Sequence, residues 1–356
     1  MTLPALHALE DCADFSKTVE PFIPQLLELP TKLLAVVQSR GTGFLDLYLH
    51  TNPLVSGFAV SLALGAVFFV VSEINRNYSQ VDRCWSILPT LYIAHFGTWA
   101  RLNGVASTRL DAAVLFSTIW SLRLTFNYAR KGGYSIGSED YRWEVVRKRI
   151  PAWLFHIFNL TFISFIQSVL LFALAAPAYL LLLSTQFEKE LSHADIAFVA
   201  VELGLILTEW FSDQQQWDYQ SAKKQYQKTA KVPKGYTQAE MDRGFVTSGL
   251  WGYIRHPNFA AEQTIWFLFY QWGCFATKSL YNWAGAGPAF LIMLFQGSTW
   301  LTELLTAGKY PEYADYQNSV GMFMPTSFSP YKTPAPKVPK IIRTSELAKK
   351  HKQKQK

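Results

Sequence analysis

The residues best suited to chemistry lie in a basic turn and at the start of the helix expected to follow it. Arg255 and His256 stand directly before Pro257. A proline suits the first turn of a helix, because its missing N–H would have had no partner. An arginine, an imidazole and free helix N–H groups suit an anion such as a phosphate or a carboxylate. The alternative interpretation is a basic flank at a membrane interface with an ordinary helix cap.

The helix expected after this turn carries Asn258, Glu262 and Trp266 at a spacing of four. Residues at that spacing lie on one face of a helix. This face can therefore hold an amide, a carboxylate and an indole against one flat polar ligand.

The composition favours a membrane protein without a metal centre. Half of the 356 residues are hydrophobic, with 12 Trp, 17 Tyr and 26 Phe, and Trp and Tyr favour the membrane interface. The three cysteines lie far apart and no HxxxH pair occurs, so we expect neither a disulfide framework nor a metal site. The first twenty residues lack an apolar core, so we expect no cleavable signal peptide.

Seven apolar blocks reach, or nearly reach, the length that crosses about 30 Å of hydrocarbon. The fourth block is overlong and contains Gln167 and Pro177, so it is either one kinked helix or a hairpin. The blocks are residues 54–74, 84–100, 112–128, 152–183, 194–211, 258–276 and 288–305.

Loop charge favours a single helix for the fourth block. Residues 130–150, residues 212–257 and the C-terminal tail are rich in Lys and Arg. Counting the fourth block once puts all three on one side, as the positive-inside rule requires. We therefore predict an all-α, polytopic membrane bundle of about seven transmembrane helices, with a lumenal N-terminus and a cytosolic C-terminus.

Composition also divides the chain into three parts. Residues 1–50 are expected to lie on the membrane surface, residues 51–330 to form the helical domain, and residues 331–356 to be a basic, disordered tail. The tail is expected to meet anionic membrane lipids rather than nucleic acid. Lys352 and Lys354 match the dilysine pattern that coat proteins read for retrieval, which predicts a multi-pass protein of the endoplasmic reticulum membrane.

Ionisable residues within the blocks indicate function, because they are costly in hydrocarbon. Glu202, Glu209, Asp213 and Gln216 fall on one helical face, and Arg123 lies inside the third block. Either Arg123 and Glu202 pair with each other, or the stripe lines a polar cavity that leads toward the basic turn.

These segments, taken in order, resemble the steroid 5-alpha-reductase-like membrane superfamily over roughly residues 75–325, in its branch described as a domain of unknown function. The resemblance implies a seven-helix fold that binds NADPH and reduces a carbon–carbon double bond conjugated to a carbonyl, here in a lipid or sterol-like substrate. The matching segments are residues 79–85, 120–124, 139–143, 213–214, 249–262, 313–316 and 324–325.

The resemblance also assigns residues to the cofactor. Lys223 and Lys224 add cationic donors near the assigned arginines. No GxGxxG follows an expected strand, so the cofactor would bind between helices. The family's carbonyl-polarising Glu and Tyr have no aligned counterpart, although Glu73 and Tyr78 are of the right types. The assigned cofactor residues are Asp213, Arg243 (whose spacing to Gly249 departs by one from the family pattern), Trp251, Arg255, His256, Asn258, Phe259, Glu262 and Trp266.

Two other functions stay open. Membrane methyltransferases of the isoprenylcysteine carboxyl or phospholipid type carry a similar turn and bind S-adenosylmethionine there. The second alternative is a lipid-binding protein that keeps the fold but does not catalyse a reaction. Residues 82–85 and 139–142 favour the reductase-like branch, and cofactor binding separates the three.

Overall fold

The computed structural model describes residues 2–39, 42–105 and 107–332. Within these residues the regular elements are helices. One isolated β-bridge pairs Ile254 with Gly321. The prediction of an all-α fold is confirmed. Most of the predicted tail, with its dilysine pattern, lies outside the described residues.

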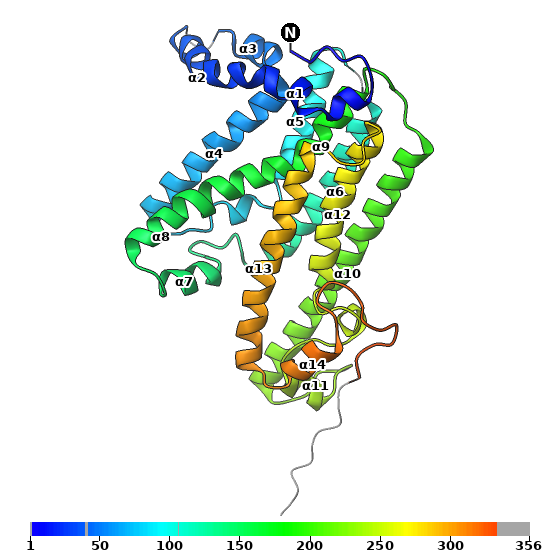
Figure 1. Ribbon diagram of the computed structural model, residues 1–356. Coiled ribbons are helices and arrows are strands. Elements are labelled where there is room, and N and C mark those ends of the chain that lie inside the picture. Colours follow the sequence, from blue (N-terminus) through cyan, green and yellow to red (C-terminus); the bar gives the residue numbers. More distant parts are fainter. Residues whose placement is uncertain (1, 40–41, 106, 333–356) are drawn as a thin grey trace, which may run out of the picture.

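Each of the seven apolar blocks forms a long helix, and the helices gather into one bundle (Figure 1). Three helices are long and apolar enough to cross a membrane: Pro53–Asn75, Ala152–Ser184 and Trp283–Lys309. The bundle helices are α4 (Pro53–Asn75), α5 (Leu88–Leu102), α6 (Thr108–Arg130), α9 (Gln167–Ser184), α10 (His193–Thr229), α12 (Pro257–Ala276) and α13 (Ala286–Lys309).

The overlong fourth block is one helix rather than a hairpin, as loop charge predicted. It begins as α8 (Ala152–Phe158), passes through a π-helical segment, η4 (Asn159–Ile166), and continues as α9. Almost every residue of α9 is buried, because α4, α5, α6, α12 and α13 surround it. A helix that is apolar on all sides suits this central position.

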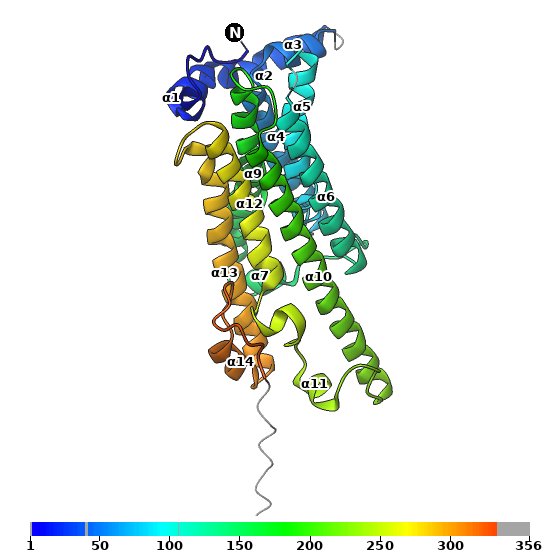
Figure 2. The same cartoon turned by 90° about the vertical axis from the view of Figure 1, so that its right-hand side faces the viewer.

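The region after the fifth block differs from the prediction of a basic loop. α10 continues well beyond Phe211 to Thr229, and Figure 2 shows its polar half running toward α11 (Gln238–Arg243). Gln and Lys are frequent there, and both residues favour helix. Tyr219 and Ala222 of this half pack against Met241 and Trp251.

Short helices close the two ends of the bundle. At one end lie α1 (Phe15–Thr18), α2 (Ile23–Gln38) and α3 (Phe44–His50), across the start of α4 (Figures 1 and 2). α2 exposes Leu27, Leu34 and Val37, which suits the predicted place on a membrane surface. Toward the other end lie α7 (Tyr141–Arg147), α11 and α14 (Tyr313–Ser319).

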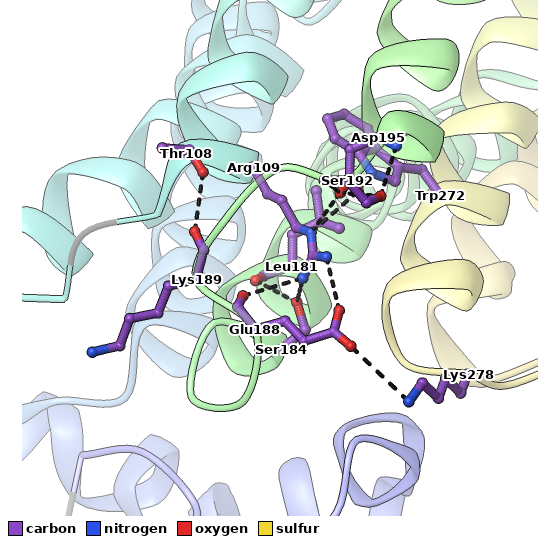
Figure 3. A network of polar contacts seen from close by, with 10 residues as sticks. All are labelled: Thr108, Arg109, Leu181, Ser184, Glu188, Lys189, Ser192, Asp195, Trp272 and Lys278. Atoms are coloured by element: carbon purple, nitrogen blue, oxygen red, sulfur yellow. Dashed lines mark hydrogen bonds and ion pairs between the residues drawn. The ribbon is translucent and has the colours of Figure 1, made fainter.

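A buried ionic network joins four helices near the α1 end (Figure 3). Arg109, in the first turn of α6, donates to Asp195 at 3.1 Å and to Glu188 at 3.0 Å. Asp195 also accepts a hydrogen bond from the indole of Trp272 at 2.6 Å, and Arg109 contacts Ser184 at the end of α9. The network thus ties α6, α9, α10 and α12 together.

We predict that Arg109→Leu lowers the free energy of unfolding by about 3–5 kcal/mol, because it leaves a buried carboxylate without its partner. The matched control is Arg101→Leu, which removes an arginine whose pair with Asp111 is exposed and should cost no more than about 1 kcal/mol. Thermal unfolding in detergent measures both. Equal losses in the two variants would show that the Arg109 network does not stabilise the bundle.

Candidate functional site

A single buried arginine lies among three carboxyl groups in the middle of the bundle. Arg123 of α6 donates to Asp213 at 3.0 Å and to Glu262 at 3.2 Å, and it also contacts Glu209. Glu209 and Asp213 come from α10, and Glu262 comes from α12. The guanidinium satisfies the requirement that a buried charge be paired, but it faces more acids than it can neutralise.

Two indoles and an amide complete this cluster. Trp120 and Trp266 donate to the two oxygens of Glu262 at 3.0 and 2.8 Å, and their rings pack edge to face. Asn258 donates to Asp213 at 3.2 Å. Asn258, Glu262 and Trp266 therefore face the same cluster, as their spacing of four predicted. Trp120 had no assigned role, although its segment was among those that carry the resemblance.

Several buried polar atoms around the cluster have no hydrogen-bond partner within the described residues. They belong to five side chains, and buried polar groups are nearly always satisfied unless a water, ion or ligand completes them. The atoms are Nε of Arg123, Oδ1 of Asn258, Oγ of Ser212, Oε1 of Gln216 and both carboxyl oxygens of Glu202. The cluster is thus incomplete in a way that a polar ligand would remedy.

The interpretation that Arg123 pairs with Glu202 is wrong. Arg123 contacts the acids about two and three turns farther along α10, while Glu202 is completely buried and neither of its oxygens is bonded within the described chain. Two acids of the α10 stripe therefore contact Arg123 directly, and the alternative, a polar cavity that leads toward the basic turn, stays a prediction.

The predicted anion-binding pair forms a second network. Arg255 donates to Glu303 of α13 at 2.6 and 3.1 Å and to the backbone oxygens of Gln317 and Val320. His256 shares a hydrogen bond with Glu303 at 2.8 Å. In this arrangement the two side chains clamp α12 to α13 and to the C-terminal segment, instead of facing an open anion site.

Phe259 and Trp251 support the same clamp. The ring of Phe259 stacks on His256 with centroids 5.5 Å apart, and the backbone oxygen of Trp251 accepts a hydrogen bond from Tyr316. Glu303 received no role from the sequence, yet an acid inside the last apolar block was the available signal.

The remaining assigned residue, Arg243, is the last residue of α11 and lies beside Lys223 of α10, which donates to the backbone oxygen of Gly244 at 2.6 Å. The side chain of Arg243 is buried, contacts Thr247, and has no acidic partner within the described chain, and its Nε is unbonded. Lys223 donates to Tyr310 at 2.6 Å. Burial alone would raise the pKa of Tyr310, but the hydrogen bond and the charge of Lys223 lower it, so this region is electropositive.

We predict that Glu202→Met raises the free energy of unfolding by about 1–3 kcal/mol, because the wild-type carboxyl is buried without a partner. Arg123→Met should lower it by about 3–5 kcal/mol, because three acids would lose their guanidinium. Chemical or thermal unfolding in detergent measures both. A loss in Glu202→Met that matches the loss in Arg123→Met would show that the two side chains depend on each other after all.

Comparison with known proteins gives a family but no activity. An uncharacterised protein of Schizosaccharomyces pombe is 40% identical over 326 residues, which cover 91% of this chain and 93% of the yeast protein. No solved structure matches. The family described as "Protein of unknown function (DUF1295)" matches residues 68–320, which include the Arg123 cluster and the Arg255 clamp. The chain therefore belongs to this steroid 5-alpha-reductase-like family.

Proposed function

We propose that this protein is a membrane-embedded reductase that uses NADPH to reduce a carbon–carbon double bond in a lipid or sterol-like enone. The observation that supports this most is the set of unpartnered polar atoms around Arg123, at the place where four of the assigned cofactor residues meet. Asp213, Asn258, Glu262 and Trp266 are those four.

The cluster suits the nicotinamide half of the cofactor. The unbonded N–H of Arg123 and the unbonded oxygens of Asn258 and Gln216 match the mixed donors and acceptors of a carboxamide and ribose hydroxyls. When bound, NADPH supplies the hydride and leaves a cationic ring. The surplus of carboxyl groups around Arg123 would stabilise that developing positive charge.

The basic cluster suits the phosphate half. Arg243 is a buried arginine with spare donors, and Lys223 lies on α10 beyond Asp213. Ten residues of helix separate Asp213 from Lys223, which corresponds to roughly 15 Å. Along its length α10 thus passes from an acidic to a basic region, which suits an extended dinucleotide.

The runner-up is an S-adenosylmethionine-dependent methyltransferase. An acid-rich buried cluster would also attract a sulfonium cation, so the Arg123 site alone does not separate the two. The electropositive region around Arg243 and Lys223 favours the reductase, because S-adenosylmethionine carries no phosphate.

We also propose a membrane topology for the bundle. Helices α5, α6, α10 and α12 run beside the three apolar spans (Figures 1 and 2). We propose that they also cross the membrane, which gives seven spans with a lumenal N-terminus and a cytosolic C-terminus. Lys223 and Arg243 would then face the compartment where NADPH is found.

We predict that the protein in detergent binds NADPH more tightly than NADH and does not bind S-adenosylmethionine. Glu262→Gln and Asn258→Ala should each weaken NADPH binding by about ten- to a hundredfold, since hydrogen bonds to charged groups contribute about 1.5–3 kcal/mol. Arg243→Ala should remove the preference for NADPH over NADH. Calorimetric titration measures all of these.

Thr264→Val is the matched control for this titration, because Thr264 is exposed on the opposite side of α12 and its hydroxyl bonds only its own helix. This variant should bind NADPH like the wild type. Binding of S-adenosylmethionine but not of NADPH would contradict the reductase and favour the methyltransferase. Binding of neither would favour the non-catalytic lipid-binding protein.

We predict that replacing Lys352 and Lys354 by Ser lets the protein leave the endoplasmic reticulum, because the dilysine pattern would be lost. Fluorescence microscopy of tagged protein measures this, and replacing Gln353 and Gln355 is the control. Retention of the doubly substituted protein would rule out this signal, and a lumenal tail would overturn the proposed topology.

A further inference from the structure

A large apolar cavity lies outside the polar clusters described so far. It has a volume of about 900 Å³ and is bounded by α4, α7, the π-helical segment, α9 and α13. This volume is near the upper end of the roughly 300–1,000 Å³ found for small-molecule sites. Its walls are aromatic and aliphatic, with Phe162, Leu170, Phe290 and Met293 among the lining residues.

The cavity lies among the three helices that are long and apolar enough to cross a membrane. Phe290 and Met293 of α13 line it and are still largely exposed. An exposed apolar surface of this extent is usually buried by a partner or a ligand. Between membrane spans, the molecule available to bury it is a lipid with a hydrocarbon chain. The π-helical segment contributes Phe162, Phe165 and Ile166 to the lining, in keeping with the frequent occurrence of π-helix at functional sites.

One end of the cavity is polar, and its arginine is paired with a carboxylate. Arg142 donates to the hydroxyl of Ser298 at 2.8 Å, and both residues line the cavity. The charge of Arg142 is balanced by Asp140, which accepts two hydrogen bonds from its guanidinium at 2.9 and 2.8 Å. This end therefore offers N–H and O–H donors to a neutral oxygen, such as a hydroxyl or a carbonyl, rather than to an anion.

Two sequence segments with no part in the Arg123 cluster build this polar end. Trp143 donates to Asp82 at 2.7 Å, and the backbone N–H of Asp140 donates to Ser79 at 2.8 Å. These contacts hold residues 139–143 against residues 79–85, two of the segments that carry the family resemblance. These two bonds fix the position of Arg142, because Asp140 before it and Trp143 after it are both held by residues 79–85.

Residues 79–85 also contact the cavity wall directly. Trp85 donates to the side chain of Gln167 at 2.7 Å, and Gln167 lines the cavity at the start of α9. Residues 79–85 and 139–143 therefore contact the cavity wall, while the Arg123 cluster is built from α6, α10 and α12.

We propose that this cavity binds one membrane lipid that has a long apolar chain and an uncharged hydroxyl or carbonyl head. The chain lies between α9 and α13, and the head accepts hydrogen bonds from Arg142 and Ser298. Binding at this site does not require a cofactor, so the inference stands apart from the proposed reductase activity.

Gly297 provides a clean way to close the cavity. It lines the cavity on α13, and a Cβ added there would meet no atom within 4 Å. Gly297→Phe therefore places a ring in the cavity without a backbone clash. Gly308 is the matched control, because it lies on the same helix, has equally open space and is not part of the lining.

The test is photolabelling of the purified full chain, without nucleotide, by a long-chain alcohol that carries a diazirine and an alkyne. We expect labelled peptides from α9 and α13 in the wild type, displaced by excess unlabelled alcohol. Labelling should fall by about tenfold or more in Gly297→Phe, and should stay within about twofold of the wild type in Gly308→Phe. The matching fatty acid, which is anionic at neutral pH, should compete less well than the alcohol.

Three results would overturn the proposal: labelling that excess alcohol does not displace, labelling that lies outside α9 and α13, or equal labelling of the two glycine variants. Stronger competition by the fatty acid would overturn the assignment of a neutral head. NADPH titration of Gly297→Phe should match the wild type, so a failure of the proposed reductase and a failure of this site are measured separately.

Discussion

The burial of Arg123 is the constraint on which the arrangement of the bundle depends. A guanidinium at that depth needs acceptors on several sides, and α10 and α12 supply them through Glu209, Asp213 and Glu262. The three helices are therefore held in one register. Because the acids outnumber the arginine, the same contacts that position the helices leave a polar surface that a ligand would complete.

α12 transmits this constraint to the rest of the bundle. The turn before it clamps α13 through Arg255, His256 and Glu303, while its first two turns contact α10 through Asn258 and α6 through Glu262. One helix thus fixes two neighbours on different sides. A displacement of its basic turn would move the residues assigned to the cofactor, even though that turn contacts a carboxylate instead of an anion site.

Local patterns made the helices and one face of the site predictable. Apolar length predicted seven transmembrane helices, and among the described residues three helices are long and apolar enough to cross a membrane. Loop charge predicted that the fourth block is continuous, and a spacing of four predicted that Asn258 and Glu262 face one cluster. The partners of Arg123 and Arg255 were not predictable, because they lie many residues away and one sequence holds no pairing signal. The polar half of α10 was missed because most of its residues are polar, and because Tyr219 and Ala222 pack on residues that lie farther along the chain.

The buried networks of Arg109 and Arg123 differ in one respect that separates structure from function. Every polar atom of Arg109 and Asp195 is bonded within the described chain, so that network needs nothing more and holds one end of the bundle closed. Around Arg123, by contrast, buried donors and acceptors are left over. Both networks incur the cost of burying charge, and only the second has bonding capacity to spare. That capacity is why chemistry is assigned to the middle of the bundle and not to its end.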